Sequence, residues 1–275
     1  MSNEFSDRES SEGVLARSAG EMAERASVVE AHELIMAAQN IAVLSGAGIS
    51  TDSGIPDFRG PQGVWTKNPA AEKQANLANW MSDPEMRRNA WRNRVQNTKP
   101  QPQPNAGHRA LVELEKQGRL HTLVTQNVDG LHLAAGHSPE KVVEVHGTIR
   151  EAVCMSCGDR MSMESAIERV RNGEEDLACY LCGGIIKSAT ISFGQSLEPE
   201  SLMRAELAAE RCDLLLAVGT TLTVFPINEM APLAVASGAK LVVVNGEETA
   251  FDHIADAVVR QPISTVLPQL VTLLA

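Results

Sequence analysis

The sequence predicts an α/β protein with a doubly wound parallel sheet of Rossmann-like type, a smaller zinc-ribbon module and a helical insertion. Short runs of Val, Leu and Ile alternate with segments of helical periodicity, which is typical of strands buried on both faces of a parallel sheet. Several of these runs end in small or polar residues. Two Cys-x2-Cys pairs interrupt the alternation past the middle of the chain.

The first segments are an N-terminal extension and a helix–strand unit. Residues 1–27 are polar and charged, and we expect them to be flexible. The spacing of Val29, Leu34 and Ile35 predicts a helix over 28–39. A buried strand follows at 40–45.

The remaining elements divide the domain 28–275 into three parts. Pro, Asn, Trp and Arg dominate 51–105, which predicts a helical and loop insertion. Residues 150–187 form the cysteine module, and the Rossmann-like part comprises 28–50, 106–149 and 188–275. In the Rossmann-like part we expect helices at 107–117, 201–211 and 227–237, and strands at 121–125, 142–145, 213–218 and 240–244.

Charge and composition exclude several classes of protein. The net charge of −11 and the pI near 5.2 disfavour a nucleic-acid or membrane-surface binder, because both polyanions would be repelled. No apolar run reaches the roughly 20 residues of a spanning helix. The N-terminus has no apolar signal segment, so we expect a cytoplasmic protein in a reducing compartment. The oligomeric state is left open, with a monomer as the working expectation.

The paired cysteines predict a structural zinc site. Cys154 and Cys157 are separated by 21 residues from Cys179 and Cys182, and this is the spacing of a four-thiolate zinc ribbon. Four protein ligands leave no open position for catalysis. Two disulfides or ordinary buried thiols are the alternatives, and the expected reducing compartment disfavours disulfides. Cys212 has no partner spacing and is expected to be a core thiol.

Small or polar clusters follow four of the expected strands, and in an open parallel sheet such positions form the ligand crevice. Taken alone, Gly46-Ala47-Gly48 is equally compatible with a simple turn, because the third glycine of the dehydrogenase fingerprint is replaced by Thr51. Four clusters at equivalent strand ends are better evidence than any one of them. They are Ser45 to Gly48, Thr125-Gln126-Asn127, Gly219-Thr220-Thr221 and Asn245-Gly246.

Polar residues near these ends are candidates for binding and proton transfer. Asn127 and Asp129 alternate around Val128, so both could reach one pocket; an Asx-rich turn is the alternative. His146 follows the strand 142–145, and its imidazole suits a general base, although a structural histidine is the more common finding at such a position. The polar loop from Ile49 to Gly60 is expected to close over the ligand.

Together these segments resemble the sirtuin family, the NAD-dependent protein lysine deacylases. The resemblance covers about residues 30–275, and the motifs occur in the family's order. They are Gly46-Ala-Gly-Ile-Ser50, Ser53-Gly-Ile-Pro-Asp-Phe-Arg59, Gln126-Asn-Val-Asp129, His146-Gly147, the two cysteine pairs, Ser192-Phe-Gly194, Gly219 to Pro226 and Val242-Val-Val-Asn245.

The resemblance implies a binding role for many of these residues. The diphosphate and adenosine half of NAD would lie against Gly46, Ala47, Gly48, Arg59, Gly219, Thr220, Thr221, Asn245 and Gly246, with Asp256-Ala257-Val258 along the adenine. The nicotinamide half would contact Ile55, Asp57, Phe58, Gln126, Asn127, Asp129 and His146. An acylated-lysine protein would bind as a strand at Ile191, Phe193, Gly194 and Val224.

The implied reaction consumes NAD and removes an acyl group, most simply acetyl, from lysine. The acyl oxygen attacks C1′ of the nicotinamide ribose as nicotinamide leaves, and His146 and Asn127 are the implied catalytic residues. His146 acts as base toward a ribose hydroxyl, and water then yields free lysine and O-acyl-ADP-ribose. The alternatives are a protein mono-ADP-ribosyltransferase and a non-catalytic module that senses NAD or ADP-ribose.

The chain departs from the family pattern ahead of the Phe-Gly turn. Lys187-Ser188-Ala189, Thr190-Ile191 and Gln195 replace the usual basic-Pro-acid, Val-Val and acidic residues, so peptide docking or acyl choice is expected to differ. The Tyr-x-x-Arg pair of desuccinylase members is absent, because Tyr180 is the single tyrosine. Trp91-Arg-Asn-Arg94 lies in the corresponding region, and we expect two side chains on the surface of the insertion.

Overall fold

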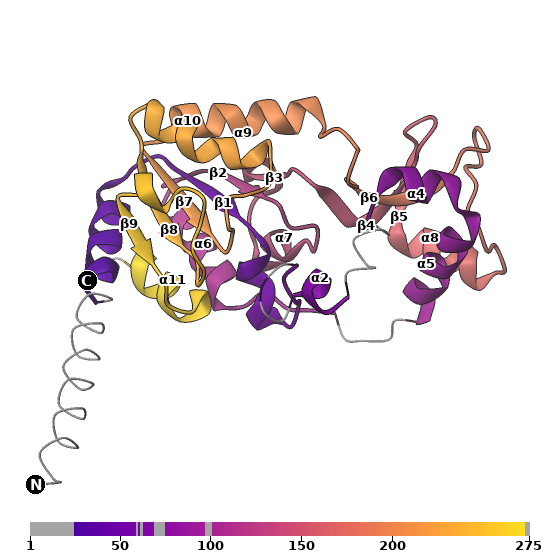
Figure 1. Ribbon diagram of the computed structural model, residues 1–275, viewed down its shortest axis with the longest axis horizontal. Coiled ribbons are helices and arrows are strands. Elements are labelled where there is room, and N and C mark those ends of the chain that lie inside the picture. Colours follow the sequence, from indigo (N-terminus) through magenta and orange to yellow (C-terminus); the bar gives the residue numbers. More distant parts are fainter. Residues whose placement is uncertain (1–24, 59, 61–62, 69–74, 97–100, 273–275) are drawn as a thin grey trace, which may run out of the picture.

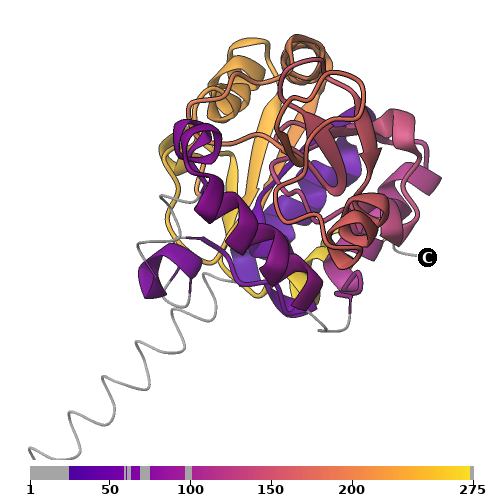
Figure 2. The same cartoon turned by 90° about the vertical axis from the view of Figure 1, so that its right-hand side faces the viewer.

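The computed structural model describes residues 25–58, 60, 63–68, 75–96 and 101–272. Most of the expected N-terminal extension (1–24) lies outside the described residues, as does Arg59. Figure 1 shows two lobes side by side: a larger one around a parallel sheet, and a smaller one that carries the cysteine loops. Figure 2 views the molecule from the side of the smaller lobe.

The larger lobe confirms the predicted doubly wound parallel sheet. Its strand order is β3-β2-β1-β7-β8-β9, and all neighbouring strands pair in parallel. The chain therefore moves outward from β1 in one direction to β2 and β3, and in the other to β7, β8 and β9. The strands are β1 (Ile41–Ser45), β2 (Leu120–Thr125), β3 (Val142–Glu144), β7 (Leu214–Val218), β8 (Lys240–Val244) and β9 (Ala257–Val259).

Both faces of this sheet are covered because its central strands are apolar throughout. In β7, Leu214 and Leu216 pack into one core, and Leu215 and Ala217 pack into the core on the opposite face. The first core is completed by the helical residues 25–37, α6 (Ala106–Lys116) and α11 (Ile263–Val271). The second is completed by α9 (Pro199–Arg211) and α10 (Met230–Ala236), above the sheet in Figure 1.

The smaller lobe joins the helical insertion to the cysteine module. It contains an antiparallel sheet, β5-β4-β6, formed by β4 (Gly147–Cys154), β5 (Arg160–Ser162) and β6 (Ile186–Thr190). The helix α8 (Met163–Arg171) shares a buried core with α4 (Leu77–Ser82) and α5 (Pro84–Gln96). The remaining short helices are η1 (Ala47–Ser53), α2 (Val64–Lys67), α7 (Leu131–Ala135), η2 (Pro139–Lys141), η3 (Ile227–Glu229) and η4 (Asp252–Ile254).

An ion pair and two tryptophans fix the insertion to the cysteine module. Arg87 of α5 donates twice to the carboxylate of Asp176 (2.8 and 2.7 Å) and once to the carbonyl of Trp80 (2.8 Å). Trp91 is fully buried and meets Trp80 edge-on, with ring centroids 6.2 Å apart. The expectation that Trp91 lies on the surface was therefore wrong, because this indole fills the core between α5 and α8.

Most predicted elements of the larger lobe occur within two residues of their expected bounds. The predicted helix at 227–237 begins as η3 and continues as α10. The pattern gave no indication of β9 or α11, although α11 contributes four buried side chains to the core.

Candidate functional site

The small and polar clusters meet at the carboxyl edge of the parallel sheet, as predicted. Main-chain hydrogen bonds join them across neighbouring strands: Gly46 N–H donates to Val218 O, and Gln126 N–H donates to Ser45 O, both at 2.9 Å. Gly219 N–H donates to Val244 O at 2.9 Å. The centre of this edge lies between β1 and β7. Successive strands are added outward in opposite directions on the two sides of this point, and open α/β sheets bind ligands at such a point.

Three glycines allow two loops to touch at this point. Gly48 N–H donates to Gly219 O at 2.9 Å. A Cβ on Gly46 would lie 2.6 Å from that carbonyl oxygen, and one on Gly219 would lie 2.4 Å from the nitrogen of Ile49. Gly219 also has a positive φ of 63°, which disfavours other residues. A side chain at Gly46 or Gly219 would therefore push the two loops apart.

Asn127 and Asp129 are held in one network by Ser50. The amide Nδ2 of Asn127 donates to Gly46 O (3.0 Å) and to Ser50 Oγ (3.2 Å). Ser50 Oγ in turn donates to Asp129 Oδ2 at 2.8 Å. The Asx-turn alternative is also realised, because Asp129 Oδ1 accepts the N–H of Leu131 (2.9 Å). The two polar side chains therefore do reach a common position.

His146 is presented as a neutral base at the same edge. Its Nδ1 lies 3.0 Å from the carbonyl oxygen of Gln126, and a carbonyl can only accept, so Nδ1 carries the proton and Nε2 is left with its lone pair. Burial lowers the pKa of His146 below its ordinary value, and the contact with the Gln126 carbonyl opposes this only in part. Gln126 also donates from Nε2 to Thr220 Oγ1 at 3.0 Å, which ties the residue to the opposite loop.

Most of the remaining residues of the predicted dinucleotide site lie at the carboxyl edge of the sheet. Thr220 and Asn245 are buried at the carboxyl edge, and Gly246 is exposed beside them. Thr221 Oγ1 hydrogen-bonds to Thr223 Oγ1 at 2.9 Å.

Ala257 is not brought to this edge. It is buried in the core and pairs with Val242, two residues before the end of β8. Its neighbour Asp256 accepts from Lys240 Nζ (2.7 Å) at the opposite end of that strand.

The loop after η1 is ordered around Asp57. Gly54 ends η1 with a positive φ of 83°, and Ile55 N–H then donates to Ser50 O at 3.3 Å. Asp57 Oδ1 accepts the N–H of Gly60 (3.0 Å), so this carboxylate shapes the loop. Phe58 is 46% exposed.

The segment at which the peptide is predicted to bind already has one neighbour on one side. Phe193 N–H donates to Ala75 O (2.9 Å), and Leu77 N–H donates to Phe193 O (3.0 Å). An added strand on the other side must therefore use main-chain groups adjacent to Phe193. Ile191 N–H donates to His146 O at 2.8 Å, which places this segment directly beside the base.

The residues around this strand differ in exposure. Gly194 has a positive φ of 80°, Val224 is half-buried, and Phe225 is 76% exposed.

Four of the residues that depart from the family pattern border a cavity of about 470 Å³ between α5 and β6, namely Lys187, Ser188, Thr190 and Ile191. Lys187 is buried, and its Nζ donates to the carbonyls of Ser188 and Thr190. Burial, followed by the charge of Arg94, lowers the pKa of Lys187 to about 8. Gln195 Oε1 accepts the N–H of Ser192 at 3.2 Å, so the neutral amide here closes the Phe-Gly turn.

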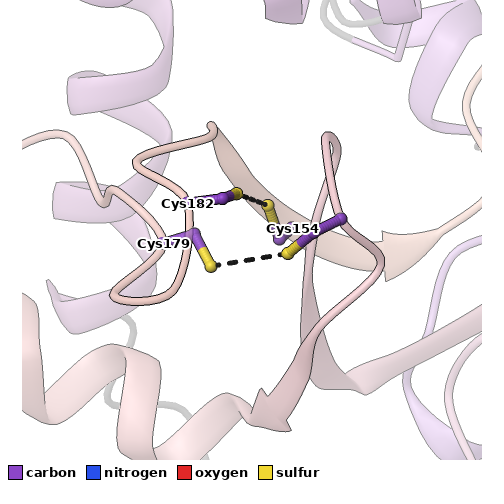
Figure 3. Close-up of side chains that lie close together, drawn as sticks. Cys154, Cys179 and Cys182 are labelled. Carbon is purple, nitrogen blue, oxygen red and sulfur yellow. Dashed lines mark hydrogen bonds between the residues drawn. The ribbon is translucent and has the colours of Figure 1, made fainter.

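The four predicted zinc ligands form one cluster, shown in Figure 3. Their sulfur atoms all lie within 4.8 Å of one another, with Cys154–Cys182 at 3.5 Å and Cys157–Cys179 at 3.7 Å. Sulfurs about 2.3 Å from a tetrahedral zinc are about 3.8 Å apart, so the cluster fits this ion. The same backbone hydrogen bond closes both knuckles. Gly158 N–H donates to Cys154 O (3.0 Å), and Gly183 N–H donates to Cys179 O (2.8 Å).

Electrostatics also favour a cation at this cluster. The backbone N–H of Cys157, with that of Ser156, lowers the pKa of Cys154 to about 6. The pKa of Cys157 is instead raised to about 12, because neighbouring sulfurs outweigh the amide of Asp159 that lowers it. A divalent ion between the sulfurs removes this conflict. His146 is not part of the cluster.

Two further predictions concern parts of the chain outside the site. Cys212 is buried, as expected of a core thiol, and burial raises the pKa of its sulfhydryl group to about 11. In the part of the chain that the structure describes, no helix is long and apolar enough to cross a bilayer.

Sequence reasoning assigned no role to three residues that hold the site together. Ser50 links Asn127 to Asp129, and Ser45 and His132 form a buried contact below them. Ser45 and Ser50 flank the Gly46–Gly48 segment, so their position in the sequence was a usable signal. The partner of each serine, however, lies about 80 residues away.

The comparisons with known proteins agree with this geometry. The model of the Sir2 family matches residues 46–226. A relative from Streptomyces coelicolor named NAD-dependent protein deacetylase 2 is 48% identical over 230 residues, which cover 84% of this chain and 95% of the relative.

Two solved structures of Sir2 are similar in fold. One is a complex with a p53 peptide and NAD+, with a TM-score of 0.76, 32% identity and coverage of 86% of this chain and 94% of that one. The other contains a deacetylated p53 peptide and 3′-O-acetyl ADP-ribose, with a TM-score of 0.77, 32% identity and coverage of 87% and 95%. The chain therefore belongs to the Sir2, or sirtuin, family.

Proposed function

We propose that this protein is an NAD-dependent protein lysine deacetylase that releases nicotinamide and transfers the acetyl group to ADP-ribose. The observation that carries the proposal is His146, a neutral imidazole at the carboxyl edge of the sheet and beside Ile191, whose Nε2 makes no hydrogen bond to the described residues. The names of the relatives and the ligands of the similar Sir2 structures support the same activity.

The binding roles follow from the position of each loop. The adenosine and diphosphate half of NAD is proposed to lie along the Gly46–Gly48 and Gly219–Thr221 loops, ending near Asn245. The nicotinamide half is proposed to lie near Asn127 and Asp129, where the side-chain oxygen of Asn127 accepts no hydrogen bond from the described residues. Arg59 is kept as a proposed ligand of the diphosphate from the family motif alone.

The chemistry proposed for this chain is proton transfer and orientation. NAD supplies the electrophilic ribose carbon, to which the acetyl oxygen of the substrate adds. Because Nδ1 of His146 is held by Gln126 O, its Nε2 is oriented to take a proton from a ribose hydroxyl. Such a positioned base typically contributes about 10²–10⁴-fold to a rate.

Zinc is proposed to have a structural role only. Cys154, Cys157, Cys179 and Cys182 would complete its coordination shell and cross-link the two knuckles of the smaller lobe. We also propose a cytoplasmic location, in which these thiols stay reduced, and the division into domains given by the sequence.

One experiment separates this function from its alternatives. The purified protein is incubated with NAD, with and without an acetyl-lysine peptide, and nicotinamide and O-acetyl-ADP-ribose are quantified. A deacetylase forms both products in equal amounts only when the peptide is acetylated. Nicotinamide release with ADP-ribose attached to protein would identify a mono-ADP-ribosyltransferase, and NAD binding without turnover would identify a sensing module.

A further inference from the structure

Three buried imidazoles adjoin the proposed nicotinamide site, where His108 Nε2 lies 3.5 Å from Ser50 Oγ. His108, His132 and His137 are 0%, 2% and 3% exposed. The rings of His108 and His132 are 5.0 Å apart, and those of His132 and His137 are 5.8 Å apart, between centroids. The reaction proposed above gives none of them a role.

His132 is linked by hydrogen bonds to the loop that carries Asn127. Its Nε2 lies 2.8 Å from Ser45 Oγ, and this hydroxyl donates its one proton to Thr125 Oγ1 at 2.8 Å. Thr125 Oγ1 also accepts the backbone N–H of Asn127 at 3.1 Å. The chain of bonds therefore runs from the imidazole, through the ends of β1 and β2, to the backbone of Asn127.

The direction of these bonds fixes the tautomer of His132. Because the Ser45 proton is already used, Nε2 of His132 must be the donor. Its Nδ1 then carries only a lone pair, and among the described residues this buried atom has no hydrogen-bond partner. An unpaired acceptor is tolerated better than an unpaired donor. Complete burial, with the neighbouring His108 and His137, lowers the pKa of His132 well below its ordinary value, so the ring is neutral.

We infer that His132 is a positioning residue, whose Nε2–H orients the Ser45 and Thr125 hydroxyls and thereby holds the backbone of Asn127 where nicotinamide binds. The inference deepens the proposed function and rests on it for the identity of the ligand. His132 acts through Ser45 and Thr125, and it has no direct part in proton transfer.

Three substitutions of His132 distinguish the effect of the position of the N–H donor from the effect of side-chain volume. His132→Phe keeps a buried ring but removes the donor. In His132→Gln the amide nitrogen is as many bonds from the backbone as Nε2, whereas in His132→Asn it is as many bonds away as Nδ1. We expect the inhibition constant for nicotinamide and the KM for NAD to rise about tenfold in the Phe and Asn variants. We expect the Gln variant to recover most of the loss.

His137→Phe is the matched control. This ring lies in the same cluster and hydrogen-bonds to Glu115 (2.6 Å) but not to Ser45. It should lower the melting temperature as His132→Phe does, while the nicotinamide constant stays within about twofold of wild type. The KM for the acetyl-lysine peptide should be unchanged in all four variants, because none of the bonds in this chain involves residues 191–194, where the peptide is proposed to bind.

Two results would overturn the inference. One is an equal loss in the Phe, Gln and Asn variants that follows their melting temperatures, and the other is a loss as large in His137→Phe. The ¹⁵N chemical shifts of His132 give a test independent of turnover, since they must show a protonated Nε2 and a bare Nδ1. If the wild type releases no nicotinamide from NAD, the proposed function fails, and calorimetric binding of nicotinamide to the same variants still decides the role of His132.

Discussion

The Nδ1 atom of His146 is hydrogen-bonded at 3.0 Å to the main-chain oxygen of Gln126. This contact joins His146, the second residue after the end of β3, to the residue that follows β2. It fixes the tautomer and the orientation of the ring together, so the site holds a base before any ligand binds. The same Gln126 bonds to Thr220, and the two halves of the crevice are thus connected through one side chain.

The lowered pKa of His146 predicts where activity declines with acid. Only the neutral imidazole is a base, and burial places its pKa below the ordinary value of about 6.5. The rate should therefore be constant through neutral pH and fall only as the pH drops through this lowered pKa. We expect kcat/KM for NAD, measured between pH 5 and 8, to show an acid limb with a midpoint below 6.5. A midpoint above 6.5 would contradict the assignment.

Gly219→Ala should disrupt the contact between the two cofactor loops. The new methyl group would lie 2.4 Å from the nitrogen of Ile49, in a residue whose φ is +63°. We expect calorimetry to show at least a tenfold loss of NAD affinity, because the Gly48–Gly219 hydrogen bond must break. Gly238→Ala is the control: its φ of +93° is also unfavourable for alanine, but nothing lies within 4 Å. If both variants bind NAD alike, close loop contact is not what the glycine provides.

Cys154→Ala should remove the metal from the smaller lobe. Three remaining thiolates bind zinc more weakly, and the knuckles lose the cross-link between them. Elemental analysis should give about one zinc per chain for the wild type and far less for the variant, which should also melt at a lower temperature. Cys212→Ala removes a buried thiol outside the cluster and should keep its zinc. Wild-type protein without zinc, or with a Cys154–Cys157 disulfide, would contradict the site.

Arg87→Ala should loosen the helical insertion from the zinc module. The guanidinium is nearly buried and pairs at two points with Asp176, so its loss leaves a partly buried carboxylate without its cation. We expect a decrease of about 3 kcal/mol in the free energy of unfolding, measured by denaturant titration. The matched variant on the same helix is Arg88→Ala, which breaks an exposed pair with Glu85 and should cost about 0.5 kcal/mol or less. Equal effects would show that the Asp176 contact adds no stability.

Short sequence patterns predicted the parts of the fold that are determined by residues close together in the chain. The apolar runs at β1, β7 and β8 are buried on both faces, and that alone indicates a parallel sheet. The Cys-x2-Cys spacing is set by the geometry of a knuckle, so Cys154 and Cys157 predicted their cluster without knowledge of the rest.

Contacts between segments that are far apart in the sequence leave no short sequence pattern that would predict them. Arg87 and Asp176 are 89 residues apart, and nothing near either of them indicates that the insertion packs on the cysteine module. The burial of Trp91 follows from the same packing and was missed for the same reason. Asp256 and Ala257 were assigned to the adenine through a family motif, but their place in the sheet depends on the register of β9 against β8.

The rate of His146→Ala with NAD and an acetyl-lysine peptide tests the central claim most directly. The account predicts that O-acetyl-ADP-ribose forms about 10²-fold more slowly or worse, while zinc content and NAD affinity stay near those of the wild type. Exchange of labelled nicotinamide into NAD should suffer less, because the base acts after nicotinamide leaves. A variant that deacetylates the peptide at the wild-type rate would remove His146 from the mechanism, and one that loses its zinc would make it a structural residue.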